Sequence, residues 1–423
     1  MREMRSALPD STEEFLTTAI RRIAGAKERG GKVVAVTGSG PNIHEGVTVQ
    51  IAELINKNLI DGVITSSAVI AHEMAGTLDR VKRIRIDDCR EIGLTIGQLP
   101  RGQVFEITLL SEGERTELRR ELPDGWDLYD HLTTSDGNVV IKAAGNMAWP
   151  MGLRTERLAR EIRDVACQYG VSLEYVAGLG SGDLTMIGAG ARKGIPVLVS
   201  IPQLVGGGAV GLALADTIPV TRRAREIASM LEGADVIIES AIALSQEIHD
   251  GPFETYTGHG IWAAWDHLPT YSLESKTLIR IDLDSNLERA WKLERGSSDI
   301  QNAVNEGLPK TKRTGIPFRM EMSGFARLEG SIPITADIGS AWPLIAFGLE
   351  KQLGVALDFI SGPQESEYGK QMRSWIADQI PYLDRSRMYR EVKQRLKERT
   401  GSEVQEAAQR RSALSTSCHG RLQ

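Results

Sequence analysis

The stretch that decides the predicted fold is KVVAVTGSGPNIHEGVTVQIAELINKNLIDGVITSSAVIAHE, which covers residues 32–73. An apolar run at 33–36 breaks into a Gly- and Ser-rich turn, a helical apolar pattern follows at 47–55, and a second apolar run at 63–64 ends in Thr65. This order predicts a β-strand, a helix and a second β-strand. Because both strands are apolar throughout, we expect them to be buried on both faces, in a parallel sheet with helices on both sides.

Small polar residues follow both predicted strands, at the place where ligands bind to parallel sheets. Glycine permits positive φ and lets backbone N–H groups approach an anion, and the helix that follows would direct its positive end to the same place. We therefore predict a phosphate-bearing cofactor here. An ordinary tight turn is the alternative, because a lone GSG is weaker evidence than a complete GxGxxG. From this unit the residues predicted to bind the cofactor are Gly38, Ser39, Gly40, Asn42, Thr65, Ser66 and Ser67.

The composition points to small-molecule ligands. The chain has 423 residues and a formal net charge of −6, so it offers no electrostatic case for binding nucleic acid or an anionic membrane. Its three cysteines, Cys89, Cys167 and Cys418, are spaced for neither a disulfide framework nor a metal site, which fits a reducing cytoplasm. We expect no bound metal, because HExxH, CxxC and carboxylate clusters at ligand spacing are absent from the sequence. The start of the chain does not have the pattern of a signal peptide, and no apolar run approaches 18 residues.

Along the chain, four segments are expected. Residues 1–92 form the first part of the cofactor-binding α/β domain, and 93–142 a strand-rich insertion. Residues 143–384 complete the α/β domain with an irregular insertion at 272–329, and 385–423 form a helical and disordered tail. The individual elements expected are helices at 11–26, 155–168 and 340–353 and strands at 173–176, 196–201, 234–244 and 331–335.

The order of short motifs resembles that of the deoxyhypusine synthase-like NAD-binding proteins. Six segments of this chain are similar to motifs of that group: GSGPN (38–42), TSSAVIAHE (65–73), GSGD (180–183), GGG (206–208), QEIHDG (246–251) and ADIGSAWPLI (336–345). The resemblance implies a Rossmann-like sheet, NAD as cofactor and assembly of several subunits. It further implies that Gly207 and Asp337 contact the cofactor, although Asp337 could equally cap the helix at 340–353. Asp183 and Asp250 match positions that hold cofactor or substrate in that group, although aspartate is also a common turn residue.

Departures from that group argue against a true deoxyhypusine synthase. The synthases form a covalent imine through a lysine close after the segment matched by QEIHDG, because a neutral amine must attack the oxidised carbon. This chain has no lysine between Lys193 and Lys276. It also carries Ala209, Val210 and Gly211 where the group has paired histidines.

The first strand–helix–strand unit also resembles the bifunctional-type (LOR/SDH) ornithine cyclodeaminases. These have a Gly-Pro turn followed by a histidine and an A-x-x-x-HD strand end, similar to GPNIH (40–44) and AVIAHE (68–73) here. Both families oxidise a carbon–nitrogen bond transiently with NAD. The two resemblances therefore imply an NAD-dependent enzyme that acts on a small amine or amino acid.

Several titratable and aromatic residues are candidates for the chemistry. His72 beside Glu73 could accept a proton from a substrate amine, although a pair bonded to nearby backbone is the alternative. Trp262 lies in the segment TYTGHGIWAAW (255–265), which could form an aromatic wall around a cation or pack in the core. The predicted catalytic residues are His72, Glu73, His249, Asp250 and His259, and the predicted substrate-binding residues are His44, Asp183 and Trp262.

Two classes of function remain open. The first is the enzyme just described, and the second is a non-catalytic relative that keeps the nucleotide fold for binding or regulation. Histidines at several strand ends favour the enzyme. We also expect a homo-oligomer, a dimer or a tetramer, because Trp126, Trp149 and Trp291 are large apolar groups in polar contexts that suit contact surfaces.

Overall fold

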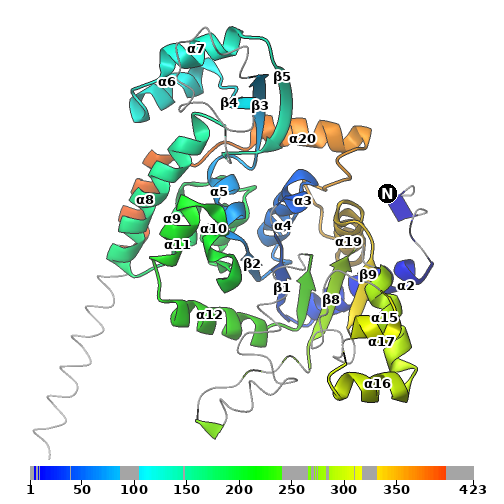
Figure 1. Ribbon diagram of the computed structural model, residues 1–423. Helices are drawn as coiled ribbons and strands as arrows, with labels where there is room; N and C mark the ends of the chain where they lie inside the picture. The colour runs from blue at the N-terminus through cyan, green and yellow to red at the C-terminus, as the bar shows by residue number, and fades with distance from the viewer. Residues whose placement is uncertain are drawn as a thin grey trace, which may run out of the picture.

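The computed structural model of the chain is shown in Figure 1. The residues that it describes are 4–5, 8, 10–38, 40–85, 104–145, 148–240, 265–267, 271, 273, 275–282, 285–308, 310–316 and 331–396. All statements below concern these residues.

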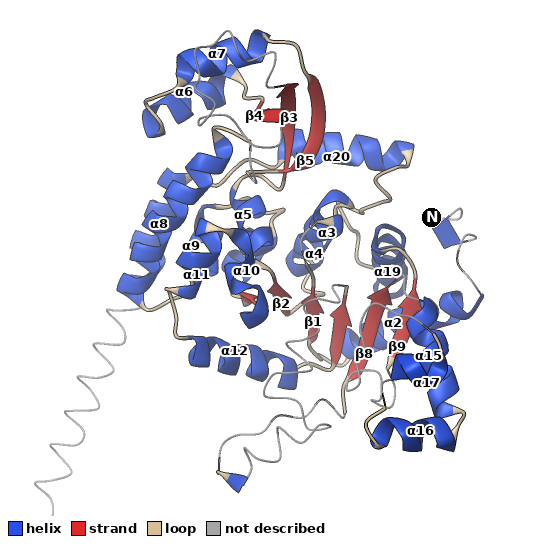
Figure 2. Cartoon of the chain, in the orientation of Figure 1, coloured by secondary structure: helices blue, strands red, loops and turns tan. Residues whose placement is uncertain are grey.

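A six-stranded parallel sheet forms the centre of the molecule (Figure 2). Its order is β6-β2-β1-β7-β8-β9, so that the strands, numbered along the chain, run 3-2-1-4-5-6 across the sheet, as in Rossmann folds. The structure thus confirms the predicted α/β fold with a parallel sheet flanked by helices. The strands are β1 (Val33–Val36), β2 (Gly62–Thr65), β6 (Val197–Val199), β7 (Val236–Glu239), β8 (Thr277–Asp282) and β9 (Ile332–Thr335).

Alternate residues of each strand pack on opposite faces of the sheet. Val33 and Ala35 of β1 belong to the larger core, and Val34 and Val36 belong to a smaller core beneath α12. This is why five of the six strands carry no polar residues between their ends; β8 is the exception, with the buried Arg280 inside the strand. The larger core takes residues from α2 (Asp10–Glu28), α3 (Pro41–His44), α4 (Val47–Asn56), α5 (Ser67–Met74), α8 (Met151–Tyr169), α9 (Leu173–Gly180), α10 (Met186–Lys193), η3 (Ile201–Gly207), α11 (Ala209–Ala215), α19 (Ile338–Leu353) and α20 (Glu367–Gln379). Helix α12 (Val220–Glu232) packs on the smaller core, and α15 (Ser285–Arg295), α16 (Ser298–Asn305) and α17 (Lys310–Thr314) follow β8 in the chain.

The strand expected at 173–176 is wrong: these residues begin helix α9. The side chain of Ser172 accepts a hydrogen bond from Tyr175 N at 3.3 Å and so caps the helix. Leu173 and Val176 both face the core at helical spacing. A run of four residues could not distinguish a buried strand from a buried helix turn.

A second, antiparallel sheet lies above the carboxyl ends of the large sheet (Figure 1). Its order is β4-β3-β5, formed by β3 (Leu78–Arg85), β4 (Val104–Thr108) and β5 (Asn138–Ala143). Helices α6 (Glu112–Glu121) and α7 (Trp126–Thr134) accompany it. Trp126, Trp149 and Tyr129 pack against one another in this unit, with ring centroids 5.4–6.2 Å apart. Trp126 is buried in this cluster, so the expectation that it forms a contact surface is wrong, whereas Trp149 is only partly buried; homo-oligomer formation stays a prediction.

A buried ion pair completes the edge strand β6. Glu174 Oε1 accepts a hydrogen bond from Val199 N at 2.9 Å, and Arg223 Nη1 donates to Val199 O at 3.2 Å. The two side chains also bond to each other at 2.5 Å, and both are fully buried. The pair therefore takes the place of a neighbouring strand at an edge that would otherwise expose backbone groups.

Replacing Arg223 with Met should destabilise the protein by about 3–5 kcal/mol, because Glu174 is left as a buried, uncompensated charge. Urea unfolding followed by circular dichroism measures this. Arg222→Met is the matched control on the same helix, since Arg222 is exposed and pairs with Glu226 in solvent; it should cost at most about 0.5 kcal/mol. A cost for Arg223→Met as small as that of the control would contradict this role of the pair.

Candidate functional site

The ends of β1 and β7 meet at the point where the strand order reverses, which is the ligand crevice of this class of sheet. Asn42 Nδ2 donates to Ser240 O at 3.3 Å, and Ser240 Oγ donates to Asn42 Oδ1 at 3.1 Å. Ser240 Oγ also lies 3.4 Å from Thr37 Oγ1. Polar side chains from both strand ends therefore meet at this point, and Asn42 holds them together.

The turn after β1 needs glycine for its backbone. Gly40 has φ 62° and ψ −111°, a conformation that L-residues avoid, and a Cβ there would meet no atom within 4 Å. Open space next to a glycine backbone suits the approach of a ligand. Helix α3, which follows, has only four residues, so the positive helix end expected here is weaker than that of a long helix.

Two hydroxyl groups at the ends of β2 and β6 have no hydrogen-bond partner within the described part of the chain. Thr65 Oγ1 and Ser200 Oγ are both buried, and the two residues are neighbours, because Ser200 N donates to Thr65 O at 2.9 Å. A buried hydroxyl without a partner costs stability. A polar ligand at the carboxyl ends of β1, β2 and β6, called the strand-end rim below, would give both hydroxyls a hydrogen-bond partner.

The other predicted residues of this rim have structural partners. Ser66 caps α5 by accepting from Val69 N at 3.3 Å, and Ser67 Oγ donates to Gln203 O at 2.6 Å. A Cβ on Gly207 would lie 2.8–2.9 Å from Ser67, so glycine is required there by close packing of η3 on α5.

Asp337 caps a helix at the end of β9. Its Oδ1 accepts from Gly339 N at 2.8 Å at the start of α19. Burial raises the pKa of Asp337, which the Gly339 N–H opposes and the Glu365 charge reinforces. The cap role, which the sequence left as an alternative to ribose binding, is the one that the geometry displays.

Glu45 lies beside Asp337 and was not predicted. Its two carboxylate oxygens accept from Gln364 N at 2.7 Å and from Gln364 Nε2 at 2.8 Å. Burial raises the pKa of Glu45 to about 7, and the Asp337 charge contributes in the same direction. The position would have been hard to identify, because its partner lies 319 residues away in sequence.

Two histidines of the α/β domain are held by consecutive residues at the end of β5. His44 Nε2 accepts from Ala143 N at 3.2 Å, and His72 Nδ1 lies 2.6 Å from Ala144 O. These partners assign the proton to Nδ1 in both rings. His44 thus presents an N–H donor, and His72 Nε2 presents a lone pair with no hydrogen bond from the described residues.

Both imidazoles are held neutral. Burial lowers the pKa of His44, and the Arg373 and Lys142 charges lower it further. Burial likewise lowers the pKa of His72, the Ala144 carbonyl opposes this, and the His44 and Lys142 charges add to the lowering. A neutral imidazole with a free Nε2 is able to accept a proton at neutral pH.

Glu73 does not pair with His72. Its carboxylate accepts from Met186 N at 2.8 Å and Ile187 N at 3.0 Å, at the start of α10. The group is almost fully buried, and burial raises its pKa to about 7 against the effect of the two N–H donors. Its contacts join α5 to α10, and no hydrogen bond of the described residues connects it to the imidazole.

Arg373 of α20 is a second residue that sequence reasoning missed. One of its Nη atoms donates to Ile141 O, and its buried Nε has no hydrogen-bond partner among the described residues. It lies close enough to lower the pKa of His44. Nothing in the charge-rich sequence around 367–379 distinguishes it from the exposed arginines nearby.

Asp183 lies away from this group. Its carbonyl accepts from Asn56 Nδ2 at 2.8 Å, at the end of α4 that leads into the start of β2. Its exposed carboxylate pairs with Arg192 at 2.8 Å. The predicted site residues Ser39, His249, Asp250, His259 and Trp262 lie outside the described residues.

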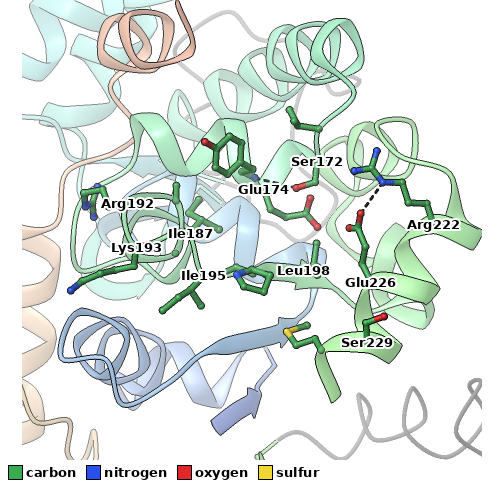
Figure 3. A pocket seen from close by; sticks show the side chains of 18 of the residues that line it. Ser172, Glu174, Ile187, Arg192, Lys193, Ile195, Leu198, Arg222, Glu226 and Ser229 are labelled. Carbon is green, nitrogen blue, oxygen red and sulfur yellow. Dashed lines mark hydrogen bonds and ion pairs between the residues drawn. The ribbon is translucent and has the colours of Figure 1, made fainter. Parts of the chain in front are cut away.

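A cavity of about 1090 Å³ lies along the outer edge of β6, bordered by α9, α10 and α12 (Figure 3). Ile187, Ile195 and Leu198 form much of its apolar lining, and Arg222 pairs with Glu226 on one side. None of the predicted site residues that the structure describes lines this cavity, which therefore lies apart from the strand ends.

Within the described ranges, no group of three His, Cys, Asp or Glu side chains is arranged to hold a metal ion. No helix of that part of the chain has the length and apolar character needed to cross a bilayer.

Comparison with known proteins gives only weak similarities. No protein family profile matches the chain, and no curated protein matches it. Among solved structures, an AgrE mutant in complex with L-arginine is 15% identical, with a TM-score of 0.39 over 81% of this chain and 34% of that one. AgrE with ornithine and NAD⁺ is 14% identical, with a TM-score of 0.38 over 80% of this chain and 33% of that one.

A conserved LOR/SDH protein from Methanococcus maripaludis S2 is 10% identical, with a TM-score of 0.38 over 83% of this chain and 72% of that chain. The chain spans about a third of the length of the AgrE structures. Similarities this low assign neither a family nor an activity to the chain. The resemblance to deoxyhypusine synthase-like proteins stays a prediction.

The histidine pair should make stability depend on pH. Because the folded pKa of each ring is lowered, the unfolded chain binds more protons below its pKa of about 6.5, and stability falls as the pH drops through that value. We expect His72→Gln to lose less unfolding free energy than the wild type between pH 7.5 and 5.5 in urea titrations.

Buried carboxyls with raised pKa values act in the opposite direction, but they are present in both proteins, so the difference isolates His72. Equal losses in the two proteins would show that His72 is not held neutral.

Proposed function

We propose that the protein is an NAD-dependent enzyme that oxidises a carbon–nitrogen bond of a small amine or amino acid transiently, and that it is not a deoxyhypusine synthase. The observation that carries this is the position of two neutral imidazoles at the carboxyl ends of a sheet with Rossmann strand order. Such a sheet offers a nucleotide crevice, and the imidazoles offer proton transfer beside it.

The strand-end residues fit a nucleotide in two respects. The hydroxyls of Thr65 and Ser200 are buried without a hydrogen-bond partner among the described residues, so ribose or phosphate oxygens that reached them would supply the missing partners, and the open backbone at Gly40 permits close approach. Many dinucleotide sites have an acidic residue near the end of the second strand for the ribose. Here Thr65 and Ser66 stand there, so we propose that hydroxyl groups take this role.

The chain's own groups would handle the substrate proton. His72 Nε2 would take a proton from the substrate ammonium, and the Nδ1–H bond to Ala144 O would orient the ring and stabilise the imidazolium. The Nδ1–H of His44 would donate to a substrate oxygen or nitrogen. When bound, NAD would accept the hydride from the carbon that bears nitrogen.

The alternative, a non-catalytic nucleotide-binding relative, is supported by one observation. Glu73 and Asp337, both predicted for the site, are engaged as acceptors for the starts of α10 and α19. A protein that only binds a nucleotide would need no more than this framework. Binding of NAD without turnover would favour it.

Purified protein should bind NAD or NADH in calorimetry. Thr65→Val should weaken binding about three- to tenfold, because one hydrogen bond contributes about 0.5–1.5 kcal/mol. Ser361→Ala is a matched control, since Ser361 Oγ is also buried without a partner among the described residues but lies beside Gln50, away from the rim. If neither nucleotide binds at millimolar concentration, the cofactor proposal fails.

Once an amine or amino acid that the wild type oxidises has been found, His72→Gln should lower kcat for that substrate about 100-fold or more. NAD affinity should stay unchanged, because the substitution removes only the proton acceptor. Ornithine is the first probe, given the resemblance of residues 40–73. NAD reduction followed at 340 nm with single-turnover amounts of enzyme is the readout. Wild-type rates in the variant would exclude His72 as the base.

A further inference from the structure

We propose that a second cavity, between α6, α8 and the segment after residue 382, binds a small oxyanion of the phosphate class. The cavity has a volume of about 200 Å³. The charged residues that line it are Arg120, Glu121, Arg154, Arg157, Glu161 and Arg385. It shares no residue with the strand-end rim, so this proposal is independent of the proposed function.

The floor of the cavity is a buried arginine with an unused donor. Arg154 is 1% exposed; its Nε donates to Glu121 Oε2 at 2.7 Å, and its Nη2 donates to Glu121 Oε1 at 3.2 Å and to Leu383 O at 3.0 Å. Its guanidinium also lies over the ring of Tyr382, 4.4 Å from the centroid. Nη1 is buried and has no hydrogen-bond partner among the described residues. An unsatisfied charged donor is costly, and because Arg154 lines the cavity, an oxyanion bound there would place acceptors next to its guanidinium.

The opening of this cavity carries two arginine side chains whose charge no carboxylate of the described residues neutralises. Arg120 and Arg157 are exposed and make no ion pair or hydrogen bond within the described part of the chain. The two glutamates are already used, Glu121 by Arg154 and Glu161 by Arg385 at 2.7 Å. Four arginines against two glutamates leave an excess of two positive charges, which a dianion would balance.

Size and geometry restrict the ligand. A volume of about 200 Å³ corresponds to roughly six or seven water molecules, enough for a tetrahedral oxyanion and some water. It lies below the roughly 300–1,000 Å³ of sites for drug-sized ligands, which excludes a dinucleotide. Planar guanidinium groups donate paired N–H bonds that match phosphate oxygens, so several arginines around one point favour this class over a single carboxylate.

The test is calorimetric titration of the full chain with inorganic phosphate at constant ionic strength. We expect saturable binding of one phosphate per chain, and at least a tenfold loss of affinity in the double variant Arg120→Gln/Arg157→Gln. Both side chains are exposed, so the variant should fold like the wild type in circular dichroism. Arg160→Gln, an exposed arginine of the same helix that does not line the cavity, should bind phosphate like the wild type.

Two further titrations identify the source of the oxyanion. Tighter binding of a phosphomonoester such as phosphoserine than of inorganic phosphate would assign the site to a phosphorylated small molecule, and weaker binding to the free ion. Saturable binding of malonate but not phosphate would overturn the phosphate class. Absence of saturable phosphate binding, or wild-type affinity in the double variant, would overturn the site itself.

Discussion

Two consecutive peptide groups at the end of β5 hold the two histidines on which the proposed chemistry depends. Ala143 ends β5 of the small sheet and Ala144 follows it, whereas His44 ends α3, which follows β1, and His72 lies in α5, which follows β2. A buried imidazole needs a partner for its ring nitrogens, and these peptide groups supply one each. The same two bonds therefore join the sheets, choose the tautomers and leave one donor and one acceptor for a ligand.

Most charged groups near the strand ends are committed to the framework. Glu73 fastens α10 to α5, Asp337 caps α19, and Glu45 binds the backbone of the segment before α20. Each takes over N–H groups that a helix start or a loop would otherwise leave buried and unpaired. Among the described residues, the groups that the proposed site leaves for a ligand are two hydroxyls, a glycine backbone, two imidazole nitrogens and one guanidinium N–H of Arg373. The proposed site is built from these groups.

The sequence predicted the parallel sheet and the strand-end turns well because both follow from local patterns. Apolar runs that end in Gly or Ser specify a buried strand and its exit, as at Val36 and Thr65. The helix that begins at Leu173 was missed because the short run Leu-Glu-Tyr-Val fits either structure, and the burial of Trp126 was missed because packing between separate segments leaves no local signal. Glu45 and Arg373 depend on contacts across more than 200 residues, which no spacing rule reveals.

The central claim is that the nucleotide lies along the carboxyl ends of β1, β2 and β6, next to the histidine pair. Hydrogen–deuterium exchange with and without saturating NAD tests it most directly. The account predicts slower exchange on binding in peptides that cover 37–44, 65–72 and 200–207, with little change along the outer edge of β6 at 190–197. Protection confined to the β6 edge, or no protection at the strand ends, would contradict it.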